Sequence, residues 1–413
     1  MAHLVHVCHT WRRVLFATPA HLGVSLICDS RTPLKELLAR SPPLPLIVYW
    51  GSSGTFDTDD SLENILCALK HPDRVRRITL RMCVRSLHKI FSSVKGPFPI
   101  LETLQLFCSF DSGPCINPSR FEAPKLRHLQ LSNLTILSPS TQSQLLFKNA
   151  SYAASRRSIV TFSLGEITTT PAALSAGLAS MPCLKVLKIG VAFSIRTART
   201  NRMERHLLTG DKPEPASLNF GELEEFEYKG TSDYLEAIAA RITAPFLKKL
   251  SVEIFNAVYL PNFTTFKHLS QRISKIVDLS FQFARVRFKE GFSIAMDHNE
   301  LSTGRGAFEL IFKHRVYYPD LNIGLVANIC RVLAPKPSTV QSLLLDGGVR
   351  TNWDPSQDRE GWRELLRVFK NIKTLRVTGR FVELLNEALK PDREARRFGR
   401  VCPCCKRSCF RRF

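Results

Sequence analysis

Four cysteines near the C-terminal end are the residues whose types come closest to a recognisable chemistry. Cys402, Cys404, Cys405 and Cys409 lie close together among many arginines. Four thiolates suit zinc, and positive neighbours favour the deprotonated sulfur. An ordinary zinc ribbon uses two cysteine pairs separated by a long loop, and here the fourth cysteine follows too soon. We therefore predict a disordered basic tail over 389–413, with no metal and no cofactor assigned, and zinc binding by this tail is the alternative.

No other group of residues predicts catalysis. The stretch GSSGTFDTDD at 51–60 has neither the lysine of a phosphate loop nor the terminal glutamate of a calcium loop. The sequence also lacks a nucleophile elbow, a dinucleotide fingerprint and a pair of zinc-binding histidines at helical spacing. Isolated histidines such as His128 and His314 carry no such pattern. We expect a protein that is not an enzyme and assign no catalytic residue.

Composition and charge restrict the class of partner. The chain has 413 residues, and 58 Lys and Arg against 36 Asp and Glu give a net charge of +22. Such a balance attracts anionic partners, either nucleic acid, acidic protein surfaces or an anionic membrane. The 12 cysteines are dispersed, and Cys67, Cys108, Cys183 and Cys330 lie in apolar runs, which predicts buried free thiols in a reducing compartment. No apolar run reaches the length of about 18 residues that a membrane span needs. We expect a cytoplasmic or nuclear protein without membrane contact.

A recurring strand pattern is the most informative feature of the sequence. Its order is apolar, two variable residues, apolar, one variable residue, apolar. The pattern occurs as ILETLQL at 100–106, KLRHLQL at 125–131, CLKVLKI at 183–189, ELEEFEY at 222–228, FLKKLSV at 246–252, KIVDLSF at 275–281, TVQSLLL at 339–345 and NIKTLRV at 371–377, with weaker versions at 74–80, 158–164 and 307–313. Alternate residues of a strand point to opposite faces, so each copy has one apolar side that a short strand cannot bury alone. Stacking the copies side by side, with the strands parallel, buries these sides in a continuous core.

The segments between the strands predict helices. Stretches 60–73 and 232–242 carry their leucines and isoleucines on one stripe. Prolines precede several strands and stop the helix before them; these are Pro99, Pro124, Pro182 and Pro245. The result is an α/β solenoid with one parallel strand per repeat and helices on the outside. A doubly wound α/β domain also alternates strands and helices, but a recurring spacing of roughly 25 to 30 residues favours the solenoid.

This arrangement resembles a leucine-rich-repeat solenoid, and the first residues add a second resemblance. LVHVCHTWRRVLFATPAHL at 4–22 is similar to the C-terminal third of the F-box domain of fungal F-box proteins with leucine-rich repeats. The matching elements are Val7-Cys8, Trp11-Arg12 and the exit through Pro19 to Leu22. We expect the box to be incomplete, because its Leu-Pro start and first two helices are missing. The alternative is a plain cap helix that shields the first apolar edge of the solenoid.

The resemblance implies a non-catalytic substrate receptor of an SCF-type (cullin-RING) ubiquitin ligase. In that family the F-box docks on a Skp-type adaptor, which assigns Val7, Cys8, Trp11 and Leu15 to adaptor binding, and the repeats hold an unidentified protein substrate. The variable strand positions would face the concave side and bind that substrate. They are Arg77, Gln105, His128, Gln130, Lys188, Glu225, Glu227, Lys249, Asp278 and Arg376. Their mixed charge favours a protein partner over nucleic acid, which prefers a continuous positive track. The alternative function is a repeat scaffold that binds nucleic acid or acidic proteins without a ligase role.

Four regions follow from these patterns. Residues 1–28 form the partial F-box-like helix or cap, and 29–70 form a first irregular repeat and linker, with a helix, a Pro-rich turn and a strand over 30–50. Residues 71–388 form the solenoid, and 389–413 form the tail. A basic insertion near 194–216 interrupts the solenoid, with Arg196, Arg199, Arg202 and Arg205 at intervals of three. Such arginines suit an acidic peptide or a phosphate, and a disordered polar loop is the alternative.

Overall fold

The computed structural model describes most of the chain between residues 24 and 389. The described residues are 9–10, 13, 24–28, 34–40, 44–51, 58–94, 96–108, 122–132, 155–167, 170–191, 218–255, 281–288, 291–298, 307–313, 323–333, 337–347, 359–378 and 381–389. The chain divides into two compact units, Met1–Pro213 and Glu214–Phe413, here called unit 1 and unit 2. Both units are mixed α/β structures.

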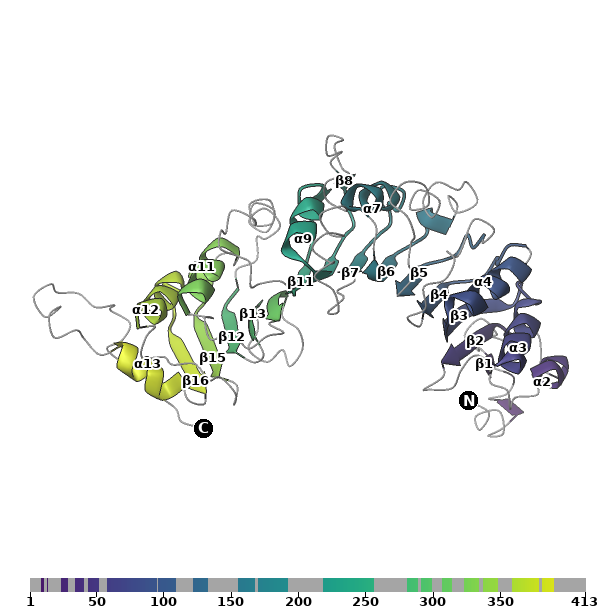
Figure 1. The fold of residues 1–413 in the computed structure, drawn as a ribbon, viewed down its shortest axis with the longest axis horizontal. Coiled ribbons are helices and arrows are strands. Elements are labelled where there is room, and N and C mark those ends of the chain that lie inside the picture. The colour runs from purple at the N-terminus through teal and green to yellow at the C-terminus, as the bar shows by residue number, and fades with distance from the viewer. Residues whose placement is uncertain are drawn as a thin grey trace, which may run out of the picture. The chain divides into compact units, whose positions relative to one another are not determined.

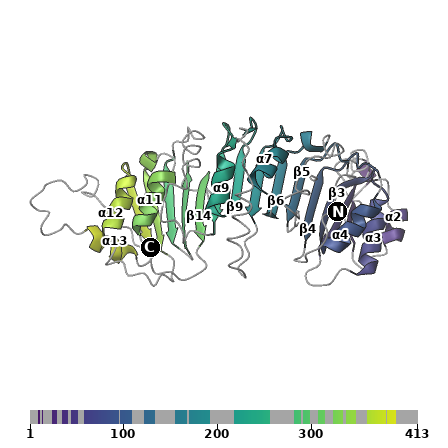
Figure 2. The same cartoon turned by 45° about the horizontal axis from the view of Figure 1, so that its top comes forward.

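Unit 1 contains seven parallel strands that lie side by side in the order of the chain (Figures 1 and 2). The strands are β1 (Val24–Ile27), β2 (Leu46–Gly51), β3 (Val75–Met82), β4 (Thr103–Cys108), β5 (His128–Ser132), β6 (Thr161–Ile167) and β7 (Val186–Val191). Parallel neighbours require a crossover connection, and four described helices of unit 1 belong to such crossovers. They are α2 (Leu34–Arg40), α3 (Asp59–Leu69), α4 (Val84–Ser93) and α7 (Pro171–Leu178).

The helices begin where the sequence supplies a cap. Thr58 precedes α3, and its Oγ1 accepts a hydrogen bond from the Ser61 N–H at 3.3 Å. Thr170 precedes α7 in the same way, with Pro171 at the first helical position. Both side chains satisfy an N–H group that the first helical turn leaves without a backbone partner. In Figure 1 these helices lie on one face of the strands. The other face, which no described helix of unit 1 covers, is here called the open face.

Burial alternates along most of the described strand residues of unit 1, except at the starts of β3 and β4. In β4, Leu104 and Leu106 are 2% and 3% exposed, whereas Gln105 between them is only half-buried. The register places the buried residues in rows across the sheet. One such row contains Leu26, Val48, Ile78, Leu104, Leu129, Phe162 and Leu187. The apolar core of unit 1 therefore lies between these rows and the helices.

The same tight turn recurs just before the strands. In Phe98–Leu101 the Leu101 N–H donates to the Phe98 carbonyl, and matching bonds close Ala123–Leu126, Met181–Leu184 and Ala244–Leu247. The second residue of each turn is a proline, whose fixed φ suits that position. The prolines predicted to stop the preceding helix thus lie inside a turn, and this turn brings the leading leucine of the strand into the core.

Unit 2 also contains a seven-stranded main sheet, but its order departs from the order of the chain. Its strands are β9 (Glu225–Gly230), β11 (Lys249–Ile254), β12 (Phe283–Phe288), β13 (Gly291–Asp297), β14 (Phe308–Lys313), β15 (Ser342–Gly347) and β16 (Thr374–Thr378). The spatial order is β9-β11-β14-β13-β12-β15-β16, and β13 is antiparallel to both of its neighbours. All other neighbours in this sheet are parallel. The short strands β8 (Leu218–Asn219) and β10 (Ile242–Thr243) pair separately.

The antiparallel strand corrects the expectation of one parallel strand per repeat. Only residues 289 and 290 separate β12 from β13, and a parallel pair needs a crossover of a dozen or more residues. Gly291, which starts β13, has a φ of 132°, a conformation that other residues rarely adopt. The strand predicted at 275–281 ends at Phe281, which is buried but precedes β12; residues 275–280 lie outside the described part. The strand predicted at 307–313 exists as β14.

The helices of unit 2 close its core with aromatic side chains. They are α9 (Ser232–Ala239), α11 (Ile323–Leu333), α12 (Arg359–Val368) and α13 (Phe381–Leu389), with a short 3-10 turn, η6 (Pro337–Thr339). Phe381 meets Phe288 at 5.0 Å and Trp362 at 5.3 Å between ring centroids, both edge to face. A Cβ atom at Gly347 would lie 3.1 Å from the Phe381 ring. Glycine at this position lets α13 pack directly on β15.

Several predictions of local structure are confirmed. Helix α9 lies within the stretch 232–242 and α2 within 30–50. Helix α3 begins one residue before the stretch 60–73, and β2 ends one residue after 30–50. Cys108 and Cys330 are buried, whereas Cys67 and Cys183 are half-buried rather than buried. Within the described residues, no helix combines the length and apolar character needed to cross a bilayer. The predicted insertion near 194–216 and the tail from residue 390 onward both lie outside the described residues.

The aromatic cluster predicts a large loss of stability when Phe381 is truncated. Phe381→Ala removes a ring that is 1% exposed and contacts both α12 and β12, so we expect the free energy of unfolding of unit 2 to fall by about 3–5 kcal/mol. Urea unfolding followed by circular dichroism measures this change. The control is Asn386→Ala, an exposed position of the same helix, for which we expect a change below about 0.5 kcal/mol. Equal effects of the two substitutions would contradict the packing described here.

Candidate recognition surface

The open face of unit 1 presents the side chains that alternate with the core. Its central row runs across strands β2 to β7, and adjacent members lie opposite each other in the sheet register. The row contains Tyr49, Thr79, Gln105, Gln130, Ser163 and Lys188. We call these residues the central row. They are half-buried except for Tyr49, which is exposed, so a partner that lies on this face can contact them.

Hydrogen bonds order the middle of the central row. The Thr79 hydroxyl donates to Gln105 Oε1 at 3.0 Å, and Gln105 Nε2 donates to Gln130 Oε1 at 3.0 Å. Each amide can still donate or accept further bonds, because an amide has two N–H groups and two acceptor lone pairs. The chain of bonds therefore fixes the orientation of these amides while leaving capacity for a ligand.

Two arginines of β3 flank the central row. Arg77 and Arg81 lie two residues to either side of Thr79 and are both exposed. The Arg81 guanidinium lies 5.2 Å from the centre of the Phe107 ring, a cation–π contact that holds it against the sheet. Across β1 to β7, none of the open-face side chains that the structure describes is an Asp or a Glu. The described open face of unit 1 therefore carries positive charge only.

The first strands of unit 1 add an apolar area to this face. Ile27 and Tyr49 are opposite each other in β1 and β2, and they are 57% and 44% exposed. A Cβ atom at Gly51 would lie 2.5 Å from the Tyr49 hydroxyl oxygen. The tyrosine side chain thus extends along its own strand over Gly51, and its ring is available on the surface beside Ile27.

The open face of unit 2 is different, because its charges pair with one another. Near β9 and β11, Lys249 Nζ lies 3.5 Å from Glu225, and Lys229 Nζ lies 3.4 Å from Glu227 and 3.9 Å from Glu253. The side chain of Glu253 is only 9% exposed. Burial of a carboxylate is costly unless a cation or a donor accompanies it, and Lys229 supplies the cation here.

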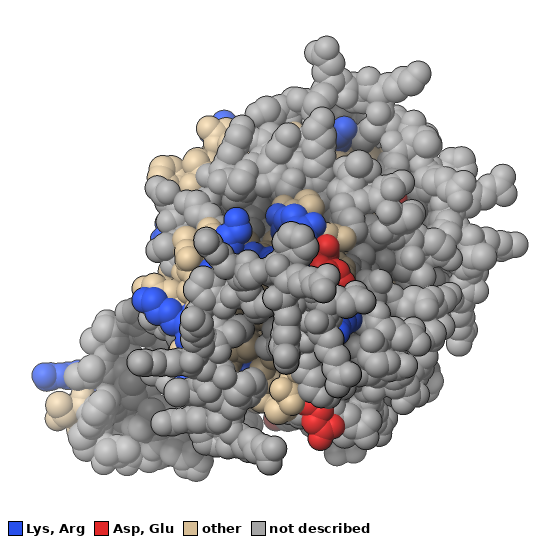
Figure 3. Space-filling view, turned by 90° about the vertical axis from the view of Figure 1, so that its left-hand side faces the viewer, with Lys and Arg blue, Asp and Glu red and all other residues tan. Residues whose placement is uncertain are grey.

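The other half of this face carries arginines. Arg287 on β12 pairs with Asp346 on β15 at 3.0 Å, and the Thr378 hydroxyl donates to the same carboxylate at 3.0 Å. Arg285 lies with its guanidinium 5.8 Å from the Phe283 ring, and Arg376 is exposed on β16. Figure 3 views the molecule from the end that carries α12 and α13, and both basic and acidic side chains are visible among the described residues there. Unit 2 therefore shows a mixed, largely internally paired surface.

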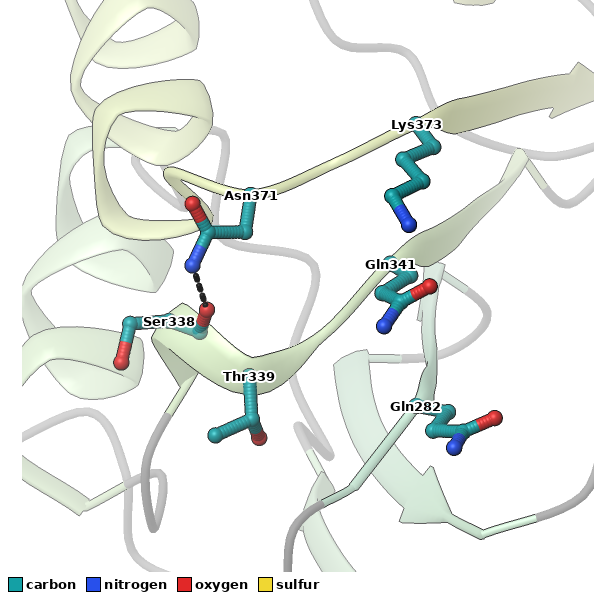
Figure 4. A pocket seen from close by; sticks show the side chains of 6 residues that line it. All are labelled: Gln282, Ser338, Thr339, Gln341, Asn371 and Lys373. Atoms are coloured by element: carbon teal, nitrogen blue, oxygen red, sulfur yellow. Dashed lines mark hydrogen bonds between the residues drawn. The ribbon is translucent and has the colours of Figure 1, made fainter.

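One polar pocket of 530 Å³ lies in unit 2 at the edge where β12, β15 and β16 begin. Figure 4 shows the side chains of Gln282, Gln341 and Lys373 one after another along this edge, each from the residue that precedes its strand. Asn371 Nδ2 donates to the Ser338 carbonyl at 2.5 Å, and Thr339 Oγ1 donates to the Phe281 carbonyl at 3.0 Å. The lining contains amides, hydroxyls and one lysine, with no carboxylate and no thiol. It is suited to hydrogen bonding rather than to acid–base catalysis.

The predicted substrate-binding residues fall into two sets. Arg77, Gln105, His128, Gln130 and Lys188 lie on the open face of unit 1, and the register joins three of them in the central row. Glu225, Glu227, Lys249 and Arg376 lie on the open face of unit 2. Asp278 and the predicted adaptor-binding residues Val7, Cys8, Trp11 and Leu15 lie outside the described residues. The binding roles of all these residues remain predictions.

The sequence patterns missed other members of the same surfaces. In unit 1 these are Ile27, Tyr49, Arg81 and Phe107, and in unit 2 they are Glu253, Arg285, Arg287, Glu309 and Asp346. Arg81, Phe107 and Glu253 each lie two residues after the last open-face residue of a strand motif that the sequence analysis recognised. Extending the alternation of each motif by two residues would have included them. Arg285 and Arg287 belong to β12, which does not carry the leucine pattern.

Metal and nucleophile chemistry find no support in the described part of the chain. No three His, Cys, Asp or Glu side chains gather there as a metal site would require. Among the described cysteines, Cys330 on α11 is fully buried, and this burial raises the pKa of its thiol well above the ordinary value. A catalytic cysteine needs the opposite shift, toward the thiolate. Cys330 is therefore a structural residue of the core.

Comparison with known proteins yields little. No family model matches the chain, and no curated protein matches it. Among solved structures, a protein from Bacteroides fragilis is similar over 70% of this chain, with a TM-score of 0.33 and 14% sequence identity. The match spans 64% of the length of that protein, less than two thirds.

The raised pKa of Cys330 predicts a protected thiol. We expect Cys330 to resist alkylation by iodoacetamide in the folded protein at pH 8 and to react once urea unfolds unit 2, because the thiolate is the reactive form and the folded core disfavours it. Peptide mass spectrometry after timed alkylation measures the modified fraction at each cysteine. The half-buried Cys67 and Cys183 serve as internal references that react earlier. Rapid modification of Cys330 in the native protein would contradict this assignment.

Proposed function

We propose that this protein is a non-catalytic recognition subunit that binds a target protein through the open faces of its sheets. The observation that carries the proposal is the open face of unit 1, where polar, basic and apolar side chains stand in register across neighbouring parallel strands. A sheet covered by helices on one face and open on the other offers many independent side-chain positions to a partner. Such a surface binds by complementarity and needs no reactive group.

We interpret the parallel strands as the repeats of a leucine-rich-repeat solenoid. Two observations support this interpretation. The strands of unit 1 follow one another in the order of the chain, and the proline turn recurs before strands of both units. Each strand then buries its apolar side only against its neighbours and the helices, as the repeat interpretation requires.

We further propose that the segment 4–22 docks on a Skp-type adaptor and thereby makes the protein the substrate receptor of an SCF-type ubiquitin ligase. The support for this role is the F-box-like order of Val7-Cys8, Trp11-Arg12 and Pro19 to Leu22. Within this segment the described residues His9, Thr10 and Arg13 are helical and exposed. Trp11 supplies a large, rigid aromatic side chain of the kind that anchors protein partners.

Adaptor binding is testable by pull-down of the full chain with a purified Skp-type adaptor. We expect the intact chain to retain the adaptor and Trp11→Ala to lower the apparent affinity at least about tenfold, because truncation of an aromatic anchor removes the largest buried contact. Arg13→Ala changes an exposed position two residues away and should bind like the intact chain. If the intact chain does not retain the adaptor, the ligase role is wrong. This result would not test target recognition through the open faces, which uses other residues.

The second candidate function is a scaffold for nucleic acid, which the net charge of +22 favours. A protein that neutralises many phosphates releases their counterions, so its affinity falls steeply with salt. For a protein of this kind we expect binding of a 20-nucleotide single-stranded RNA at 50 mM salt and a loss of about a thousandfold or more at 200 mM. Fluorescence anisotropy measures both affinities. The absence of RNA binding at 50 mM salt would eliminate this candidate.

A further inference from the structure

We propose that the polar pocket of unit 2 binds the C-terminal end of a partner protein, with the terminal carboxylate at Lys373 and the last peptide groups at Gln341 and Gln282. The pocket lies at the edge where the strands begin, not on an open face, so the inference goes beyond the proposed function. It rests on that function only in taking a protein as the partner. The support comes from the backbone that holds these residues, from the charges around them and from their order.

The backbone fixes the three residues in one row. The Gln341 N–H donates to the Gln282 carbonyl at 2.9 Å, and the Lys373 N–H donates to the Gln341 carbonyl at 2.7 Å. Each of them directly precedes its strand, and β12, β15 and β16 are parallel neighbours in this order. Figure 4 shows their side chains following one another along the pocket. We call these three residues the entry row.

The same backbone bond joins two other pairs of residues at this edge of the sheets, and there opposite charges meet. The Lys248 N–H donates to the Glu224 carbonyl at 2.7 Å, and Lys248 Nζ lies 3.2 Å from the Glu224 carboxylate. In unit 1 the Glu102 N–H donates to the Arg76 carbonyl at 2.8 Å, and the two side chains form an ion pair at 2.9 Å. In both pairs a neighbouring strand supplies the carboxylate that a cation at this position binds.

Lys373 occupies this position without such a carboxylate. Its neighbour in the entry row is the neutral Gln341, and no Asp or Glu belongs to the described lining of the pocket. Among the residues that the structure describes, none forms an ion pair with the Lys373 ammonium. A carboxylate of a ligand can therefore take the place beside Lys373 that Glu224 takes beside Lys248, and it gains a charge-assisted hydrogen bond.

The neutral groups of the pocket favour a ligand that also carries N–H donors. The amides of Gln282 and Gln341 each donate and accept, so each can pair with a peptide group. Asn371 uses its Nδ2 for the Ser338 carbonyl, which leaves its Oδ1 to accept from a ligand. A nucleic-acid phosphate offers acceptors and favours a continuous positive track, whereas the described lining has one cation. A peptide therefore fits this pocket better than nucleic acid.

The order of the entry row matches the end of a chain. Two amides come first, and the cation comes last, on β16, the last described strand of the main sheet. A C-terminal segment presents its groups in the same order, with peptide groups first and the carboxylate last. An internal Asp or Glu lacks this order, because the main chain continues past it. Two strand steps of about 4.8 Å make the row roughly 10 Å long, which about three extended residues span.

The test compares two pools of random seven-residue peptides, one with a free C-terminal carboxylate and one with a C-terminal carboxamide. Each pool is passed over the immobilised full chain at 150 mM salt, and mass spectrometry identifies the retained peptides. We expect retention from the free-acid pool to exceed retention from the carboxamide pool at least about tenfold. Equal retention, or none from either pool, overturns the proposal. Retained carboxamides enriched in Asp and Glu would show binding of a side-chain carboxylate and also overturn it.

Three substitutions that each lower the net charge by one locate the site. We expect Lys373→Met to weaken binding of the retained peptides at least about tenfold, measured by fluorescence anisotropy. Gln341→Glu recreates the arrangement of Glu224 and Lys248 and should weaken binding at least as much, because the new carboxylate pairs with the neighbouring lysine. Lys370→Met changes an exposed position outside the lining and should bind like the intact chain. Circular dichroism checks that all three variants fold.

The comparison of these variants decides the placement. If either pocket variant binds the peptides like the intact chain, or if Lys370→Met weakens binding as much as Lys373→Met, the placement in this pocket is wrong. If a 12-nucleotide single-stranded oligonucleotide displaces the peptides at 150 mM salt, the site binds nucleic acid and the peptide proposal is wrong.

The adaptor pull-down separates this inference from the ligase role. Lys373→Met should retain the adaptor like the intact chain, because 4–22 carries the proposed adaptor contact. Failure of the pocket proposal therefore appears in the peptide measurements alone, and failure of the ligase role appears in the pull-down alone.

Discussion

The described strands of the main sheets each have one apolar side that a single strand cannot bury alone. A strand of five to eight residues exposes its leucines to water unless a neighbour on each side and a helix above cover them. In unit 1 the covered side chains are nearly all below 4% exposed, as Ile78, Leu104 and Leu129 illustrate. Because burial of apolar surface is the main favourable contribution to folding, this requirement fixes the stacking of the strands. The burial requirement does not constrain which side chains occupy the open face of the sheet.

The register of the stack follows from the same requirement. A slip of one residue between neighbouring strands would move every leucine to the open face, so the buried rows align the open-face rows as well. The proline turns reinforce the alignment, since each one positions the leading leucine before the strand begins, as in Ala123–Leu126. The chain of hydrogen bonds from Thr79 to Gln130 is therefore a consequence of packing on the opposite side of the sheet. Packing of the core thus positions the open-face side chains, while the core residues themselves do not contact a partner.

This division explains which features the sequence could predict. The leucine spacing located β4, β5, β7, β9, β11, β15 and β16, because burial of alternate residues has to be written into every strand. The leucine spacing did not locate β12 and β13, because their buried positions hold Phe, Val, Ile and Met in place of leucine. The antiparallel pairing of these two strands depends on their two-residue connection. Tyr49 was missed for a related reason. LIVYWG at 46–51 is apolar on both sides, so its pattern does not reveal which residues face the open side.

The pairing of charges within unit 2 was beyond the sequence pattern, and it has a physical consequence. Along the chain, the predicted binding positions include no acidic residue up to Lys188 and both signs from Glu225 onward, and the structure shows that Lys249 of the second group faces Glu225. A lysine that already faces a glutamate, as Lys249 faces Glu225, must exchange that partner for a ligand and gains little. Exposed arginines on a face without described carboxylates gain the full interaction with an incoming anion, reduced only by solvent screening. Two sheets built on the same alternation of burial therefore have different capacities for recognition, and the difference lies entirely in the residues that folding leaves unconstrained.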